Sequence, residues 1–328
     1  MPCEGAWIVS ETKQHGFPEP ILILGFNRPD RVRELIDTLR PMRPTNVFLA
    51  VDGPRADHPT DQQLVQQTQE CAELIDWDCT VATRFLPENQ GCGHAVSSAI
   101  DWFFTQVERG IILEDDVSPG PQFFDFCAEL LEYYQDDDRV FAISGCNFVP
   151  ADVPEQSASY RFSALTHVWG WATWARAWQH YEFDMTRWRA RLPLTRRWHA
   201  MGGDIGGFTY WTAVFDWMRW GKIDTWDYQW TLAQMAAGGL TATANANLVE
   251  NVGFRDDATH TVDKPSFVRD IEPLTFPLSH PEVRRDLTAD RWVRARVLQV
   301  STQGAWRMVK DNLLQRVVGV RDKVRGSK

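Results

Sequence analysis

Apolar runs and amphipathic segments alternate along the first third of the chain. Four segments predict strands: 20–26, 47–51, about 80–85, and 111–113 with Val117 just beyond. Three segments between them predict helices: 31–39, 61–75 and 95–107. Strands joined in this way by helices predict a parallel sheet, and right-handed crossovers bring the carboxyl ends of all four strands to one edge. We therefore expect an α/β fold with a mostly parallel, Rossmann-like sheet flanked by helices.

The run Ile111–Val117 carries the most informative chemistry, because Glu114, Asp115 and Asp116 directly follow its buried residues. In open α/β sheets, ligands bind just outside the carboxyl ends of the strands. Three adjacent carboxylates repel one another and lose hydration in a cleft, so they are tolerated mainly where a hard divalent cation neutralises them. The pattern predicts a Mg²⁺ or Mn²⁺ site that holds phosphate oxygens. The alternative is a solvated acidic turn.

Other polar residues follow the neighbouring strands of the predicted sheet. They are Asn27, Arg28, Asp52, Gly91, Gly93 and His94. The Gly91–Gly93 turn at a helix start exposes backbone N–H groups toward an anion, and Asp52 can accept a hydrogen bond from a base or a ribose hydroxyl. These features favour a nucleoside diphosphate as ligand. Turn glycines and an acidic loop cap are the alternatives.

Tryptophan is concentrated in the middle of the chain, where eleven of the 16 lie between Trp169 and Trp230. Indole rings stack on the apolar faces of sugars, although most of these rings must belong to the core because buried Trp contributes strongly to packing. Gly170 keeps the local backbone open, so we expect Trp169 and Trp171 to contact a sugar acceptor.

Charge divides the chain in two. From Val283 onward there are 12 Lys and Arg against 4 Asp and Glu, a charge of +8, which leaves −18 for the rest of a chain whose net charge is −10. Apolar residues recur there at helical spacing: Trp306, Val309, Leu313, Val317, Val320 and Val324. A basic amphipathic helix predicts contact with an anionic membrane through 283–328. Packing on the body of the protein and a homodimer contact are the alternatives.

Composition is that of an ordinary globular protein, with 24 % charged and 44 % hydrophobic residues. The six cysteines show no CxxC pair, which argues against a disulfide framework or structural zinc. No apolar run approaches the ~20 residues of a membrane span, and the first residues lack signal-peptide character. We therefore expect a cytoplasmic protein, peripheral at the inner face of the membrane if the tail binds lipid.

The stretch ILEDDVSPGPQFFDFCAELLEYY, followed by RVFAISGCN, resembles the GT-A glycosyltransferases, which use a nucleotide-sugar donor and a DxD-type acidic motif. The likeness is greatest to the N-acetylglucosaminyltransferase I type, in which an EDD triplet follows an apolar strand. The segments WDYQW and LVENVGF also resemble bacterial glycosyltransferase-like proteins. The resemblance is specific over about 110–150 and extends in order and spacing from 20 to about 260.

For the donor, the resemblance implies that Asp116 binds the metal that bridges the diphosphate, and that Glu114 and Asp115 support it or contact the ribose and sugar. It also implies that Asp52 contacts the base. The residues that would line the nucleotide site are Phe26, Asn27 and Arg28.

For catalysis, the resemblance implies that Asp227, in Trp226-Asp227-Tyr228, is the base that deprotonates the acceptor. This segment departs from a Trp-Asp-Asp-Trp arrangement, so Asp224 is the alternative base. His260 resembles the C-terminal histidine that completes the metal site in several GT-A enzymes. A helix N-terminal acid and a loop histidine are the corresponding structural alternatives.

These inferences together predict an inverting, metal-dependent glycosyltransferase that uses a UDP-sugar and a glycan or lipid-linked acceptor, without nucleic acid. The predicted organisation is an N-terminal extension (1–19), a GT-A domain (20–270) with nucleotide-sugar and acceptor halves (20–150 and 151–270), and a helical appendage (271–328). A sugar nucleotidyltransferase and a carbohydrate-binding protein are the alternative functions.

Overall fold

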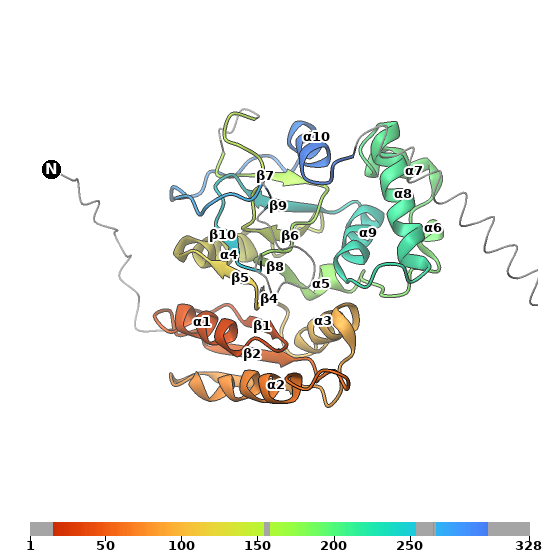
Figure 1. Cartoon of the computed structure of the whole chain (residues 1–328). Coiled ribbons are helices and arrows are strands. Elements are labelled where there is room, and N and C mark those ends of the chain that lie inside the picture. The colour runs from red at the N-terminus through yellow and green to blue at the C-terminus, as the bar shows by residue number, and fades with distance from the viewer. Residues whose placement is uncertain (1–15, 154–157, 254–264, 266, 301–328) are drawn as a thin grey trace, which may run out of the picture.

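A mixed eight-stranded sheet forms the centre of the protein (Figure 1). The computed structural model describes residues 16–153, 158–253, 265 and 267–300. The sheet has the strand order β3-β2-β1-β4-β8-β6-β9-β7. Its strands are β1 (Ile21–Gly25), β2 (Asn46–Val51), β3 (Thr80–Phe85), β4 (Arg109–Glu114), β6 (Val140–Ser144), β7 (Tyr160–Ser163), β8 (Trp171–Trp174) and β9 (Leu240–Ala244). A separate ribbon pairs β5 (Val117–Pro119) with β10 (Val249–Asn251) in antiparallel fashion.

The first four strands run parallel, as their sequence pattern predicts. Successive residues of β1 point to opposite layers: Ile21 and Ile23 join one apolar cluster and Leu22 and Leu24 another. A strand that is buried on both faces in this way has a continuous run of apolar residues in its sequence. The α/β architecture with a mostly parallel sheet is confirmed.

Helices cover the sheet on both faces (Figure 1). They are α1 (Pro29–Leu39), α2 (Asp61–Glu70), the 3₁₀ turn η1 (Cys71–Leu74), α3 (Gly91–Phe103), α4 (Pro121–Tyr133), α5 (Ala175–Trp178), α6 (Trp188–Arg191), α7 (Leu194–Ala200), α8 (Ile205–Arg219), α9 (Asp227–Ala237) and α10 (Leu287–Arg296). Pro29 lies in the first turn of α1, where a missing N–H costs nothing. α3 begins four residues earlier than predicted, at Gly91, whose φ of 76° favours glycine.

β8 is antiparallel to both of its neighbours, which the alternating pattern does not predict. It lies between β4 and β6, with Trp171 paired to Ile112 on one side and Ser144 on the other. β6 and β9 are parallel to each other. Because β4 and β6 are both antiparallel to β8, β6 and β9 run in the same direction as β4. Strands from both predicted halves, 20–150 and 151–270, therefore form one continuous sheet.

The Trp171 ring belongs to the core, so its predicted contact with a sugar acceptor is corrected. Its side chain is 1 % exposed and stacks on Trp226 with ring centroids 5.5 Å apart. Trp178 and Trp230 complete the aromatic cluster. No ring face of Trp171 is left for a ligand, because Trp171 starts the central strand β8 rather than lying in an open loop.

The start of the basic tail packs on the body of the protein through α10. Ala289 and Val293 are buried, and Asp290 accepts a hydrogen bond from Ser163 Oγ at 2.6 Å. This part of the predicted tail is therefore a packed helix rather than a free appendage. The apolar stripe Trp306–Val324 lies outside the described residues. Within the described part of the chain, no helix is long and apolar enough to cross a membrane.

Candidate functional site

Residues that follow β1 and β4 meet at one edge of the sheet, as their parallel pairing requires. The Phe26 N–H donates to Asp115 Oδ2 at 3.2 Å, and Arg28 Nη1 lies 3.1 Å from Asp115 Oδ1. Asp115 is thus held by the chain itself. Phe26 and Arg28 thus lie beside the acidic triplet, and their predicted contacts with a nucleotide stay predictions.

Burial raises the pKa of each carboxyl group in the triplet. For Glu114 the negative charges of Asp116, Asp115 and Asp227 add to burial, against a lowering hydrogen bond from the Trp226 indole. For Asp115 burial outweighs the Arg28 guanidinium and raises the pKa to about 6. The pKa of Asp116 is raised by burial, although Arg28 opposes the shift. A bound cation would relieve the mutual repulsion of these half-buried carboxylates.

The donor set of Glu114 and Asp116 fits Mg²⁺ or Mn²⁺, which take hard oxygen ligands. Mg²⁺ is commonly bound through one or two carboxylates, with water and substrate phosphates completing the shell. Among the described residues, no group of three or more His, Cys, Asp or Glu converges as a complete ligand set. Asp115 is turned toward Arg28, and His260, the predicted further ligand, lies outside the described residues.

Asp116 is fixed by the β5–β10 ribbon that follows it. Its carbonyl accepts from Val252 N at 2.7 Å. A side chain at Gly253 would place its Cβ 2.9 Å from Asp116 Oδ2 and 3.0 Å from Asp116 Cβ. Glycine at 253 therefore leaves the space that the Asp116 carboxylate occupies.

Gly253→Ala is expected to turn the Asp116 carboxylate and weaken metal-dependent donor binding by about tenfold, the effect of a ~1.4 kcal/mol loss. The reason is the close approach of Cβ to both Asp116 atoms. Titration of nucleoside diphosphate with Mn²⁺ measures the effect. Ser118→Ala on the same ribbon is the control, and equal affinities for the two variants would contradict the proposed packing role of Gly253.

Asp52 holds a turn at the end of β2. Its carboxylate accepts from the N–H of Gly53 at 2.8 Å, from the N–H of Gln90 at 2.9 Å and from Asn89 Nδ2 at 2.8 Å. Burial raises its pKa, and the backbone donors act in the opposite direction. A carboxylate has about four acceptor positions, so three are already used inside the protein. Asp52 thus orders the approach to Gly91, which leaves little capacity for the predicted base contact.

The Gly91–Gly93 turn faces a carboxylate of the chain itself. Gly93 N donates to Asp224 Oδ1 at 3.3 Å, and a Cβ at Gly93 would lie 2.7 Å from that oxygen. His94 stacks on Phe183, with ring centroids 3.7 Å apart. The turn that was predicted to bind an anionic ligand therefore contacts an anionic side chain of the protein, Asp224. From the sequence, Asp224 was considered only as an alternative base.

Asp227 is the first residue of α9. Its Oδ1 accepts from Thr225 Oγ1 at 2.5 Å and from the Tyr228 N–H at 2.9 Å. These contacts are those of a helix N-terminal acid, which was the structural alternative. The charge of Asp227 also raises the pKa of Glu114, so the two carboxyl groups are near enough to interact.

Cys92, at the start of α3, lies within the electrostatic influence of several acidic side chains. Burial, followed by the charges of Glu114, Asp224, Asp227 and Asp116, raises its pKa to about 12. The charges that act on this thiol come from residues at the end of β4, in α9 and in the segment before α9. In the sequence, the only feature that could have drawn attention to Cys92 is its position between two glycines.

Arg55 and Asp61 support the β1 end in a way that the sequence pattern does not predict. Arg55 Nε lies 2.6 Å from Asp61 Oδ2, and Asn27 Nδ2 donates to Asp61 Oδ1 at 3.0 Å. The Arg55 guanidinium also lies 5.3 Å from the Phe26 ring centroid. Asn27, a predicted nucleotide contact, is therefore oriented by Asp61.

Asp61→Asn is expected to lower the free energy of unfolding by about 1 kcal/mol near neutral pH. Hydrogen bonding to Arg55 lowers the Asp61 pKa from 3.8 to about 2. A shift of this size corresponds to at most ~2.5 kcal/mol of folding stability. Arg55 is 38 % exposed, so solvent screening reduces that value. The folded pKa is the lower one, so this stability is present above about pH 4 and lost as the pH falls through 2.

Urea unfolding near pH 7 and near pH 2.5 tests this expectation, with the exposed Asp37→Asn as control. The difference between wild type and Asp61→Asn should shrink at the acidic pH. A difference that stays constant would show that the Asp61 charge contributes nothing.

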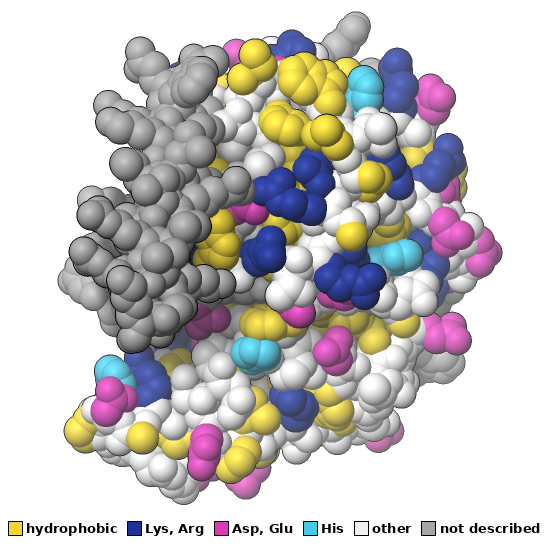
Figure 2. Space-filling model, turned by 90° about the vertical axis from the view of Figure 1, so that its right-hand side faces the viewer, with side chains coloured by type: hydrophobic (Ala, Val, Ile, Leu, Met, Phe, Trp, Pro, Cys, Tyr) yellow, Lys and Arg dark blue, Asp and Glu magenta, His cyan; other side chains and the backbone are white. Residues whose placement is uncertain are grey.

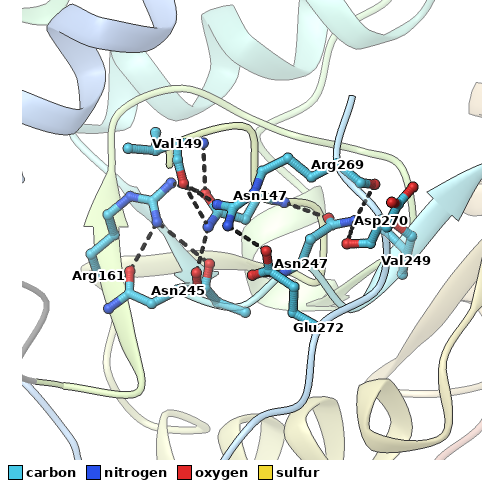
Figure 3. A network of polar contacts seen from close by, with 10 residues as sticks. Asn147, Val149, Arg161, Asn245, Asn247, Val249, Arg269, Asp270 and Glu272 are labelled. Atoms are coloured by element: carbon cyan, nitrogen blue, oxygen red, sulfur yellow. Dashed lines mark hydrogen bonds and ion pairs between the residues drawn. The ribbon is translucent and has the colours of Figure 1, made fainter. Parts of the chain in front are cut away.

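A buried polar network joins the ends of β6 and β9 at the same edge (Figure 3). Asn147 N donates to Asn247 Oδ1 at 2.9 Å, and Arg161 Nη2 donates to Asn147 Oδ1 at 2.8 Å. Burial lowers the pKa of Arg161 to about 10. Asn247 Nδ2 continues the network to the carbonyls of Val249 and Arg269. The network thereby fixes the turn that leads into β10, the strand that pairs with β5 next to Asp116.

Trp169 lies next to this network. Its ring packs edge-on against Phe148, with centroids 5.2 Å apart, and keeps partial exposure. It differs in this respect from Trp171, and its predicted contact with an acceptor stays a prediction.

Comparisons with known proteins add little. No family model matches the chain, and no curated protein matches it. Among solved structures, the chain is similar to one described as a mannose-1-phosphate geranyltransferase from Thermus thermophilus. The sequences are 12 % identical, the match covers 72 % of this chain and 76 % of the other, and the TM-score is 0.31. A likeness at that level carries no functional argument, so the function is inferred from the geometry of the chain itself.

Proposed function

We propose that the chain is a metal-dependent glycosyltransferase that moves a sugar from a nucleoside-diphosphate donor, of which a UDP-sugar is the first candidate, to the hydroxyl of a glycan or lipid-linked acceptor. The observation that supports this most is that Glu114 and Asp116 lie at the carboxyl end of β4, with the charge of Asp227 near enough to raise the pKa of Glu114. Transfer needs stabilisation of the leaving diphosphate and a base for the acceptor, and the site has carboxylates for both.

On the donor side, Glu114 and Asp116 would hold the Mg²⁺ or Mn²⁺. The cation, when bound, supplies Lewis-acid stabilisation of negative charge on the leaving diphosphate. Arg28 lies beside the triplet and offers guanidinium hydrogen bonds to phosphate oxygens. Phe26 and Asn27 follow β1 at the same edge, where a nucleoside would lie.

On the acceptor side, Asp227 would take the proton of the attacking hydroxyl. The sugar carbon then forms a bond to that oxygen as its bond to the diphosphate oxygen breaks, with inversion. The hydroxyl of Thr225 and the N–H of Tyr228 hold one carboxylate oxygen of Asp227, which orients the other. Positioning of a general base in this way contributes typically 10²–10⁴-fold to rate.

A panel of nucleotide sugars with Mn²⁺ and no acceptor tests the proposal, because glycosyltransferases hydrolyse their donor slowly. Chromatography should detect release of a nucleoside diphosphate from one donor of the panel. A second reaction, with sugar 1-phosphates and nucleoside triphosphates, should give no pyrophosphate. Pyrophosphate release alone would identify a sugar nucleotidyltransferase, and sugar binding with neither reaction would identify a carbohydrate-binding protein.

A further inference from the structure

An apolar row is exposed where α7 turns into α8. Leu194 is 66 %, Trp198 42 % and Ile205 65 % exposed. Leu194 and Trp198 lie one turn apart on α7, and the Trp198 ring is 6.3 Å from the Phe208 ring, centroid to centroid. Phe208 follows Ile205 by three residues on α8, so these side chains form a continuous row. We call Leu194, Trp198 and Ile205 the α7–α8 corner.

The corner is held rigidly by hydrogen bonds and by α10. Gly203 N donates to the Trp198 carbonyl at 2.7 Å, and Asp204 caps α8 through Gly207 N, also at 2.7 Å. The buried Arg294 of α10 lies 2.8 Å from Asp204. Arg294 also donates to the carbonyls of Met201 and Gly202. The apolar side chains are therefore presented on a preformed surface.

Basic residues surround the corner, although the whole chain has a net charge of −10. Residues 185–205 contain five arginines and one acid, Asp204, which is paired with Arg294. Arg189 pairs with Asp216, Arg191 pairs with Glu182 and Arg197 is buried, whereas Arg187 and Arg196 are exposed. Arg196 is exposed on α7, and Arg291 and Arg296 are exposed on α10. Figure 2, which faces this side of the molecule, shows hydrophobic side chains gathered in its upper part with Lys and Arg side chains around them.

We propose that the α7–α8 corner docks on an anionic membrane surface. Trp198, Leu194 and Ile205 would enter the headgroup region, where amphipathic tryptophan is favoured, and the arginines would face lipid phosphates. Each basic residue near an anionic leaflet strengthens such binding. A second copy of the chain is a poorer occupant, because a two-fold contact would set each basic corner against the same corner of its partner.

The described part of the chain also ends close to the α7–α8 corner. Val300, the last described residue, lies near Gly206, one residue from Ile205, and the basic segment 301–328 follows it in the sequence. The corner itself consists only of residues that precede this segment. Its docking does not depend on the proposed reaction, and it can be measured without a substrate.

Co-sedimentation with phosphatidylcholine vesicles, with and without phosphatidylglycerol, tests the proposal on the full chain. Wild-type protein should bind only the anionic vesicles, and less at high salt, because screening acts over ~8–10 Å at physiological ionic strength. Leu194→Gln combined with Trp198→Ser should weaken binding by at least about tenfold, as loss of buried apolar area does. Trp220→Ser, at the opposite end of α8 and 37 % exposed, is the matched control.

Two further variants separate this corner from the tail and from folding effects. Arg196→Gln with Arg291→Gln should also weaken binding while leaving the apolar row intact. Deletion of 301–328 should leave a residual affinity that the Leu194/Trp198 substitutions remove. Unchanged melting temperatures would exclude unfolding as the cause. Binding that is equal in wild type and the corner variants, or a wild-type dimer that these substitutions dissociate, would overturn the proposal.

Discussion

Asp116→Ala is expected to abolish metal-dependent donor binding while the chain stays folded. The substitution removes one of the proposed metal-binding carboxylates, and it lowers the repulsion that raises the pKa of Glu114. Stability should therefore hold or rise, because like charges in a half-buried site destabilise it. Calorimetric titration of UDP, GDP and other nucleoside diphosphates, with and without Mn²⁺, measures the loss.

Asp138→Ala is the control, since Asp138 is 94 % exposed and remote from the triplet in the sequence. Its donor affinity and melting temperature should match those of the wild type. Undiminished turnover in Asp116→Ala would refute the metal assignment, whatever the stability of the variant.

Asp227→Asn is expected to lower transfer by ~10²–10⁴-fold, the usual contribution of a positioned general base, with donor affinity unchanged. The amide is isosteric with the carboxylate, and its oxygen can still accept from Thr225 and Tyr228. It cannot take a proton from the acceptor. Initial rates of transfer and donor titrations on the same preparations separate the two effects.

Asp224→Asn is the matched comparison, because Asp224 is the alternative base and faces Gly93 across the same site. We expect it to alter donor binding more than turnover. The opposite outcome, with turnover lost in Asp224→Asn and kept in Asp227→Asn, would move the base to Asp224.

The first part of the sheet and the position of the acidic triplet could be predicted because their signals are local. Burial on both faces makes β1, β2 and β4 apolar along their length, and the linking helices require them to be parallel. Glu114 was therefore expected to end a strand at the carboxyl edge of the sheet, where the structure has it.

Contacts between distant segments could not be predicted in this way. Asp224 lies 131 residues from Gly93, and its approach depends on how α8 and α9 pack. Trp171 was interpreted from its neighbouring glycine, whereas the pairing of β8 with β4 and β6 decides its burial. For the same reason, no sequence pattern predicted that Arg55 would pair with Asp61 beside Asn27.

The position of β8 has a consequence for synthesis of the chain. β1 to β4 can pair as soon as residues up to Glu114 have emerged, but β8 starts at Trp171, 57 residues later. At ~5–20 residues per second, the edge of β4 waits about 3–11 s for its second neighbour. An unpaired apolar strand edge is a template for pairing with another chain. The nascent protein thus passes through an interval in which it is most prone to aggregate, and shielding by a chaperone would matter most there.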